Sequence, residues 1–311
     1  MRHPAYHLRP NKAVERVAFV EAINLLARLE KLSEYTYFGF GGPYLEDFRL
    51  LYELCPDLKM ISIEEDAETY KRQVFHLPCG TLELRQGGFS SFLAQYEAND
   101  EKSIFWLDYT GLAYSQFEDL MVLLGKVAAN SMIKVTLRAE PREFRDAQDE
   151  FRRRFEILMP DPSAPPPSTS HDFAYLIQGM VQIASQRALP SALPHVFQPV
   201  SSFYYSDGTG MFTLTGIVCR RSDQATVKSV FRGFRFANLD WARPKKIDVP
   251  TLSTKERLHL QHLLPCGRGA GKVLRRELGY LIDEDRPQTE EKLQQYADFH
   301  RYFPYFMKAT P

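Results

Sequence analysis

Two short stretches early in the chain carry residue types that can bind a nucleotide-like ligand. In Gly39-Phe40-Gly41-Gly42, missing side chains let a ligand approach the backbone, and the helix that follows can offer free N–H groups. In Glu64-Glu65-Asp66, a carboxylate can accept hydrogen bonds from both hydroxyl groups of a ribose. About 22 residues separate Gly42 from Glu64, as expected between a nucleotide-binding turn and its ribose acid. The spacing predicts one crevice, with Glu64 as the preferred ribose ligand.

Each stretch also has a simpler explanation. A glycine-rich turn can serve only to pack a helix against a strand. Acidic residues at the start of a helix are favoured by the helix dipole, and Asp66 is expected to cap the helix that follows it. The interval between the two stretches favours the binding interpretation over these alternatives.

Two later loops add polar groups. Gln86-Gly87-Gly88-Phe89 follows the strand-like run TLELRQ, and Asp108-Tyr109 ends the apolar run SIFWLD. The Asp108 carboxylate is expected to be partly desolvated, so it could act as a base or orient a substrate hydroxyl. Tyr109 could stack on the acceptor or hydrogen-bond to it. A magnesium site shared by Asp108 and Glu140 is a weaker alternative, since two carboxylates 32 residues apart are unremarkable, and we expect no metal.

Alternating strand and helix patterns are expected to position these loops. In a parallel sheet the carboxyl ends of the strands line one edge, where the following loops converge on a ligand crevice. An antiparallel hairpin, joined by the turn SDGTG, is expected to follow the parallel strands. The remaining elements include one charged helix over 141–155, a proline-rich loop over 160–170 and a capped helix starting near Ser253. The strand patterns cover 35–40, 59–66, 81–86, 103–111, 132–140, 196–205, 211–219 and 230–236.

The bulk composition excludes several classes of protein. The 311 residues include 39 basic and 39 acidic ones, so the overall charge gives no reason for strong attraction to nucleic acid or to an anionic membrane. The four cysteines never form a CxxC pair, which argues against a zinc ribbon or a dithiol redox motif. The sequence also lacks a signal-peptide core and any run of about 18 apolar residues, so we expect a cytoplasmic location.

Four motifs together resemble a known superfamily. The FGFGG turn, the ISIEED strand end, the RQGGF loop and the FWLDYTG strand end are similar to successive motifs of S-adenosylmethionine-dependent methyltransferases, including O-methyltransferase-like branches. The resemblance covers roughly residues 30 to 220. It implies an α/β, Rossmann-like methyltransferase fold, with a mostly parallel sheet, a terminal antiparallel hairpin and helices on both faces. We expect a helical segment over 1–30, the methyltransferase domain over 31–240 and a mainly helical appendage over 241–311.

The resemblance also implies roles for individual residues. The turn containing Gly39, Phe40, Gly41 and Gly42 would approach the methionine part of S-adenosylmethionine. Glu64, with Glu65 beside it, would hold the ribose, and the loop of Gln86, Gly87, Gly88 and Phe89 would contact the adenine. The segment from Asp108 to Gly111 would face the methyl group. Two positions depart from the superfamily pattern. Tyr37 stands where the superfamily usually has an acidic residue, and Gly88 stands where it often has an aspartate.

The resulting hypothesis is a methyltransferase that uses S-adenosylmethionine and acts on an oxygen or nitrogen atom. A small-molecule or protein acceptor is favoured. A nucleic-acid acceptor, contacted by Arg275 and Arg276, fits the neutral overall charge less well. The alternative is a diverged, non-catalytic Rossmann-like module that binds a nucleotide, a protein or a nucleic acid, and the departures at Tyr37 and Gly88 support it.

Overall fold

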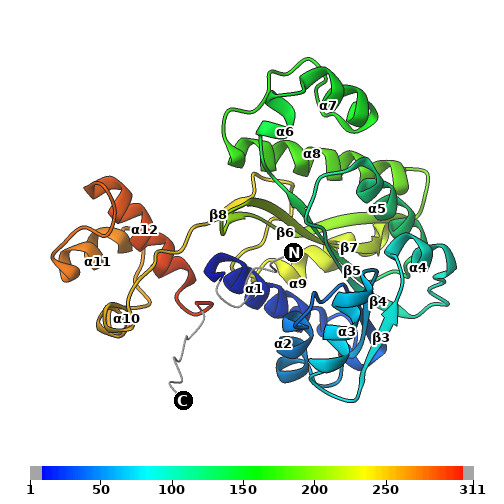
Figure 1. Ribbon diagram of the computed structural model, residues 1–311, viewed down its shortest axis with the longest axis horizontal. Coiled ribbons are helices and arrows are strands. Elements are labelled where there is room, and N and C mark those ends of the chain that lie inside the picture. The colour runs from blue at the N-terminus through cyan, green and yellow to red at the C-terminus, as the bar shows by residue number, and fades with distance from the viewer. Residues whose placement is uncertain (1–8, 304–311) are drawn as a thin grey trace. The chain divides into compact units, whose positions relative to one another are not determined.

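Four apolar runs and the more polar edge strand LELRQ form the five parallel strands that set the architecture (Figure 1). The computed structural model describes residues 9–303. The parallel strands lie in the order β3-β2-β1-β4-β5, so the chain winds first to one side of β1 and then to the other. The direction changes between β1 and β4, the place where open α/β sheets form their ligand crevice. These strands are β1 (Tyr35–Gly39), β2 (Lys59–Glu64), β3 (Leu82–Gln86), β4 (Lys102–Asp108) and β5 (Ser131–Arg138).

An antiparallel hairpin extends the sheet beyond β5. It consists of β6 (His195–Ser206) and β7 (Gly210–Arg220). Strand β7 runs antiparallel to β5, with Arg138 opposite Met211 and Ser131 opposite Val218. The short β8 (Lys245–Ile247) completes an eight-stranded sheet in the order β3-β2-β1-β4-β5-β7-β6-β8. The prediction of a mostly parallel sheet with a terminal antiparallel hairpin is therefore confirmed.

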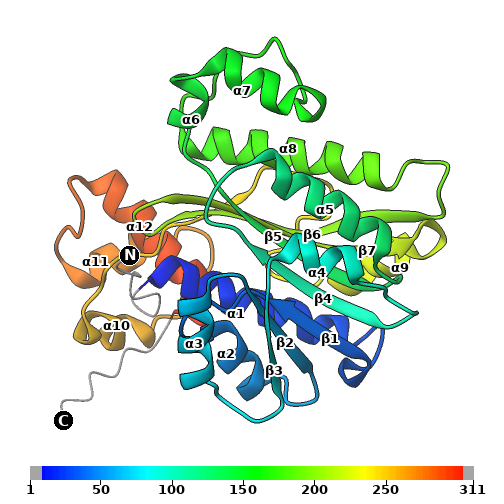
Figure 2. The same ribbon diagram turned by 45° about the vertical axis from the view of Figure 1, so that its right-hand side comes forward.

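Helices cover both faces of this sheet (Figure 2). On one face, α4 (Phe89–Gln95), α5 (Tyr114–Lys126) and α8 (Ser170–Ala188) pack on a continuous apolar cluster that includes Phe38, Phe105 and Ile133. The other face is covered by α2 (Glu46–Leu54), α3 (Ala67–Phe75) and part of α1 (Pro10–Leu26), and α9 (Gln224–Phe231) contacts β7. Because successive strand residues point to opposite faces, apolar runs without alternation are what a sheet covered on both sides requires.

The second face also buries a cation. Lys134 on β5 is fully buried, with its Nζ atom 3.3 Å from the ring centre of Trp106 and 4.2 Å from that of Phe19. The Phe19 and Trp106 rings meet edge to face at 5.4 Å. Aromatic faces attract cations, and the attraction is larger when water is excluded. A lysine in the middle of a central strand is therefore compatible with this core.

The charged segment over 141–155 differs from the prediction of one helix. It forms two short helices, α6 (Arg142–Arg145) and α7 (Gln148–Phe155), followed by the 3₁₀ turn η3 (Glu156–Leu158). In one continuous helix, Phe144 and Phe151 would lie about 10 Å apart along the axis. The break between the helices instead lets the two rings stack with their centres 4.6 Å apart. Burial of both rings outweighs the helix-forming pattern of the surrounding charges.

The strand predicted over 230–236 is wrong. The helix α9 occupies 224–231, and Val227 and Phe231 lie one turn apart on its buried side. Turns follow, with Phe234 N–H donating to the Phe231 carbonyl and Ala237 N–H to the Phe234 carbonyl. Phe231, Phe234 and Phe236 are all buried. The alternating aromatic pattern thus arises from a helix end and a turn, both of which bury phenylalanine rings.

The chain divides into two compact units. One comprises 19–204 and 208–245 and contains nearly all of the sheet. The other combines 1–18, 205–207 and 246–311. In the second unit, α10 (Thr254–Gln261), α11 (Ala270–Leu278) and α12 (Arg286–Phe299) are the helices of the C-terminal segment. The predicted cap of α10 is confirmed, because the Ser253 side chain accepts from the Glu256 N–H and the Glu256 carboxylate accepts from the Ser253 N–H.

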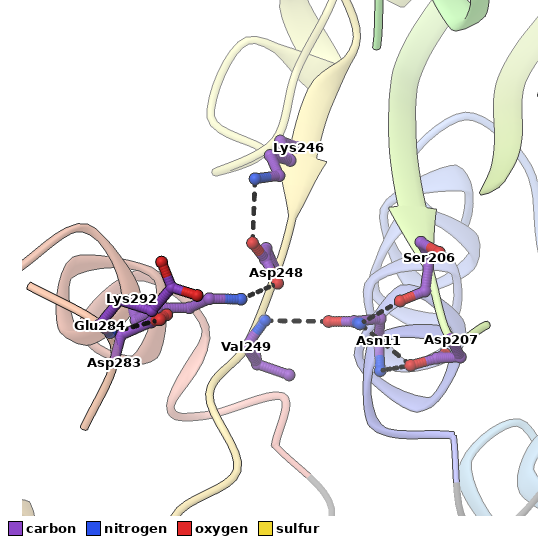
Figure 3. Close-up of polar contacts among 9 residues, drawn as sticks. All are labelled: Asn11, Ser206, Asp207, Lys246, Asp248, Val249, Asp283, Glu284 and Lys292. Carbon is purple, nitrogen blue, oxygen red and sulfur yellow. Dashed lines mark hydrogen bonds and ion pairs between the residues drawn. The ribbon is translucent and has the colours of Figure 1, made fainter. Parts of the chain in front are cut away.

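Asn11 joins the three stretches of this second unit (Figure 3). Its Nδ2 atom donates to the Ser206 carbonyl and to Asp207 Oδ1, both at 3.0 Å. Its Oδ1 atom accepts from the Val249 N–H at 2.9 Å. One amide side chain therefore satisfies polar groups of stretches that are far apart in the sequence. Across the described range, 9–303, none of the helices has the length and apolar character needed to cross a membrane.

Candidate functional site

The strand register brings the predicted binding loops to one edge of the sheet. Gly39, at the end of β1, lies opposite Ser62 on β2 and opposite Trp106 on β4. Glu64 lies two residues after Ser62 on β2, and Asp108 lies two residues after Trp106 on β4. On β3, Gln86 is the partner of Glu64. Strands are about 4.8 Å apart, so the strands of Glu64 and Asp108 are separated by about 10 Å. The two carboxylates therefore flank the turn that follows β1.

Gln73 on α3 links the glycine turn to the end of β2. Its Nε2 atom donates to the carbonyls of Phe40, at 2.8 Å, and Gly42, at 3.0 Å, and lies 3.5 Å from Glu64 Oε2. Its Oε1 atom accepts from the Ser62 hydroxyl at 3.1 Å. The side chain is fully buried. The glycine turn and Glu64 are thus side by side, and the residue that joins them was not predicted from the sequence.

The three glycines of the turn have different surroundings. A Cβ atom at Gly39 would lie 2.8 Å from the Tyr37 hydroxyl, and one at Gly41 would lie 2.7 Å from Leu45 and 2.8 Å from Phe48. A Cβ atom at Gly42 would meet no atom within 4 Å. Gly41 and Gly42 both have positive φ angles, of 69° and 54°. Gly39 and Gly41 are therefore needed for packing, whereas Gly42 faces open space.

Glu64 is held at the edge of this space. Its Oε1 atom accepts from the Asp66 N–H at 2.9 Å, and the Asp66 side chain caps α3 by accepting from the Thr69 N–H at 2.8 Å, as predicted. Burial raises the pKa of the Glu64 carboxyl above its ordinary value. Hydrogen bonds from the main chain oppose this shift, and the neighbouring carboxylates of Asp66 and Glu65 add to it.

The third loop is fixed to the same strand end. The Gly87 N–H donates to the Glu64 carbonyl at 2.9 Å. A Cβ atom at Gly88 would lie 3.5 Å from the Glu65 carboxylate, so that carboxylate lies directly over Gly88. Phe89 is buried, and its ring meets the Phe40 ring at 5.5 Å. The loop therefore adds a carboxylate and an aromatic ring to the edge.

Asp108 and Tyr109 form the other side of the turn. Asp108 is half-buried at the end of β4. The Tyr109 ring meets the Phe40 ring at 5.5 Å, and its hydroxyl donates to Asp119 Oδ2 at 2.9 Å. Burial, followed by the Asp119 charge, raises the pKa of Tyr109 far above its ordinary value. The Tyr109 hydroxyl thus stays protonated, and its hydrogen is directed at Asp119.

Asp119 was not predicted as a site residue. Besides Tyr109, it accepts from the Ser90 hydroxyl of α4 at 2.9 Å, so it joins the loop after β4 to the helix after β3. Glu140, the second residue of the weaker magnesium hypothesis, accepts from the Gly210 N–H and so fixes the start of β7. Within residues 9–303, no three His, Cys, Asp or Glu side chains gather where they could hold a metal ion.

A separate groove of about 700 Å³ lies at the opposite end of the sheet. Its residues come from the end of α8, the start of β6, the start of α9 and the segment 239–241, and they include Gln182, Phe197 and Trp241. Val218 of β7 lies opposite Ser131, the first residue of β5, so the end of β7 lies beside the start of the parallel strand β5. Arg221, which lines the groove, follows directly after β7. The groove is therefore distinct from the edge that carries Glu64 and Asp108.

Comparisons with known proteins give one match over nearly the whole chain. A family model described as "Putative O-methyltransferase" matches residues 4–311. A search of curated proteins finds no match. Several solved structures are similar. Trm1 from Pyrococcus horikoshii, solved with S-adenosyl-L-methionine, has 11% identity and a TM-score of 0.49, over 67% of this chain and 55% of that one.

Two more solved structures have similar values. TYW2 from M. jannaschii, in complex with AdoMet, has 10% identity and a TM-score of 0.36, over 65% of this chain and 76% of that one. A "putative O-methyltransferase" from Klebsiella pneumoniae has 14% identity and a TM-score of 0.35, over 70% of this chain and 92% of that one. This chain spans about half the length of the Trm1 structure.

The surroundings of the two glycines predict different costs of substitution. Gly42→Ala should lower the free energy of unfolding by about 1–2 kcal/mol, because alanine is strained at positive φ. Gly41→Ala adds an overlap with Leu45 and Phe48, so its cost should be larger by about 1–3 kcal/mol. Urea denaturation of both variants measures the difference. Equal losses would show that the turn packs on α2 less closely than described.

The buried amide of Gln73 makes a second prediction. Gln73→Met keeps the approximate volume but removes the amide donor from the carbonyls of Phe40 and Gly42, and the Phe40 carbonyl keeps the Ser62 hydroxyl and the Gly42 N–H as donors. Loss of the amide hydrogen bonds should lower the free energy of unfolding by about 1–3 kcal/mol. The exposed Gln186→Met on α8 is the matched control and should change it by less than about 0.5 kcal/mol. Denaturation curves of similar midpoint for the two variants would contradict the role given to Gln73.

Proposed function

Because the chain belongs to the methyltransferase family described as "Putative O-methyltransferase", we propose that it transfers a methyl group from S-adenosylmethionine to an oxygen or nitrogen atom of an acceptor. S-adenosylmethionine is the cofactor that this family uses. The observation that carries the proposed site is the link through Gln73, which holds the open glycine turn beside the half-buried Glu64 carboxylate.

The residues at this edge fit the cofactor. Gly42 leaves open space next to the backbone, where a side chain would intrude on a ligand. Glu64 offers carboxylate oxygens to a ribose diol. The Glu65 carboxylate lies over Gly88, so it can accept a hydrogen bond from the adenine amino group although residue 88 itself has no side chain. Gln86, Gly87 and Phe89 complete the adenine side of the proposed site.

The proposed chemistry requires mainly positioning. When bound, S-adenosylmethionine supplies an electrophilic methyl group on a positively charged sulfur. The ring of Phe40, in the glycine turn, contacts the rings of both Phe89 and Tyr109, and this aromatic cluster can exclude water and face a cation. Asp108 lies where it can take the proton of an acceptor hydroxyl or amine. Tyr109 contributes its ring, because its hydroxyl is bonded to Asp119.

A non-catalytic module that binds a nucleotide, a protein or a nucleic acid is the second candidate. Tyr37 is the observation that favours it, because the tyrosine is almost fully buried against Phe48 at the position where the superfamily usually has an acidic residue. The first candidate requires both cofactor binding and methyl transfer. A chain that binds S-adenosylmethionine but supports no transfer to any acceptor would favour the second.

Calorimetric titration with S-adenosylmethionine and S-adenosylhomocysteine tests the proposed site. We expect binding in the micromolar to submicromolar range. Glu64→Ala should weaken it by about 10- to 100-fold, because hydrogen bonds to a charged group contribute about 1.5–3 kcal/mol.

Two further variants control this experiment. Glu64→Gln keeps the shape of the side chain and its bond from the Asp66 N–H while removing the charge, so it separates loss of recognition from loss of local structure. Glu68→Ala removes an exposed acid of α3, the helix that follows Glu64, and should leave the affinity unchanged, since the partner of Glu68 is the exposed Lys71. If the wild-type chain binds neither compound, or if Glu68→Ala is as harmful as Glu64→Ala, the proposed site is wrong.

The raised pKa of Glu64 predicts how the affinity depends on pH. The ionised carboxylate accepts from both ribose hydroxyls, whereas the protonated form offers fewer acceptors, so affinity should fall as the pH is lowered from about 8 to about 5. Because burial raises this pKa, the fall should begin at a higher pH than for an ordinary glutamate. Glu64→Gln should give a flat profile in the same titrations. A profile with the same slope in both proteins would assign the titration to another group.

A further inference from the structure

The charge of this protein is balanced over the whole chain but not in each part of it. Residues 253–280 contain six basic residues and two acidic ones, which gives a formal charge of +4 in a chain of net charge 0. Within the described range, four of these basic side chains are exposed and make no ion pair: Lys255, Arg268, Lys272 and Arg276. Arg275 differs, because its Nε atom pairs with Glu290 at 2.9 Å.

Two of these cations follow one line along α11, because Lys272 and Arg276 are four residues apart, and residues at this spacing lie one above the other on a helix, about 6 Å apart along the axis. Arg268 lies in the turn just before the helix, on the N-terminal side of Gly269. The opposite side of α11 is fixed against α12, since Ala270, Gly271 and Leu274 are buried. A Cβ atom at Gly271 would lie 1.9 Å from the Glu290 carbonyl oxygen, so the two backbones cross closely. This packing turns Lys272 and Arg276 outward, and Arg268 is exposed in the preceding turn.

Exposed apolar groups accompany the cations in α10, in α11 and in the residues just after α11. Tyr280 is 50% exposed, and its hydroxyl bonds to Glu256 at the start of α10, which orients the ring. Leu258, Val273 and Leu281 are also largely exposed. An exposed aromatic ring beside a row of cations is the combination by which proteins bind single-stranded nucleic acids, through stacking and phosphate contacts. We call Lys255, Arg268, Lys272, Arg276 and Tyr280 the basic surface.

We propose that the basic surface of α10 and α11 binds a single-stranded nucleic acid that carries the methyl acceptor. The acceptor role rests on the proposed methyltransferase function, whereas the binding itself rests on the charge and packing of these helices. Several exposed like charges on and next to α11 suit the phosphates of a nucleic-acid strand. An anionic membrane is a poorer partner, because α11 has only nine residues and its apolar side is already buried against α12.

The test measures how salt affects binding of the full chain to a labelled single-stranded RNA. An oligouridine of about twenty nucleotides avoids duplex structure and spans more than one binding site of ordinary size. The plot of log affinity against log salt has a slope of about −0.7 for each phosphate contact in single strands. A triple variant, Arg268→Gln with Lys272→Gln and Arg276→Gln, should bind more weakly at low salt and should lower the magnitude of this slope by about 2.

A matched variant controls for net charge. Lys59, Arg153 and Arg187 are exposed cations of the other compact unit with no ion pair among the described residues, and changing all three to glutamine removes the same charge. This control should keep the slope of the wild type. Equal losses in the two triple variants, no binding of RNA by the wild type at low salt, or tighter binding to phosphatidylserine vesicles than to RNA would each overturn the proposal.

Titration of the same proteins with S-adenosylmethionine separates the two proposals. The α11 triple variant should bind the cofactor as the wild type does, because none of its changed residues belongs to the proposed cofactor site. RNA binding without cofactor binding would defeat the proposed methyltransferase function and leave the basic surface supported. Cofactor binding without RNA binding would leave the methyltransferase function and defeat the basic surface.

Discussion

The side chain of Gln73 is the constraint on which the candidate site depends. A carboxamide has two donors and an acceptor, and here they are used on two carbonyls of the glycine turn and on the Ser62 hydroxyl. Because the Gln73 side chain is fully buried, its own polar atoms have no water to replace a lost partner, which favours the arrangement of the turn that keeps these bonds. The same amide lies beside the Glu64 carboxylate, which couples the shape of the turn to the position of the acid.

Most of the fold could be predicted because its central strands, unlike the edge strand β3, are buried on both faces. Such strands are continuous apolar runs bounded by glycine and polar residues, and this pattern is visible without tertiary information. The two failures have a tertiary cause. The break between α6 and α7 depends on stacking of Phe144 on Phe151, and the segment after α9 depends on three buried phenylalanines. The local sequence pattern does not show which distant ring a phenylalanine contacts in the folded chain.

The candidate site was predictable to the extent that residue type and strand position define it. Glu64, Asp108 and the glycine turn follow strands, so the parallel register brings them to one edge. Gln73 and Asp119 lie within helices, and their roles depend on which way each helix turns its polar side chains. Nor could the sequence separate Gly41, which packs on Leu45 and Phe48, from Gly42, which faces open space.

The second compact unit is built from three separate stretches of the chain, which limits how the protein can be divided into fragments. Its residues come from both ends of the chain and from the tip of the β6–β7 hairpin, and Asn11 bonds to the other two stretches. No single cut in the polypeptide separates the units. A fragment that begins after α1 lacks Asn11, and a fragment that ends before Val249 removes the group to which Asn11 Oδ1 bonds. Recombination that exchanges only the C-terminal helices would therefore have to preserve a matching asparagine near the start of the chain.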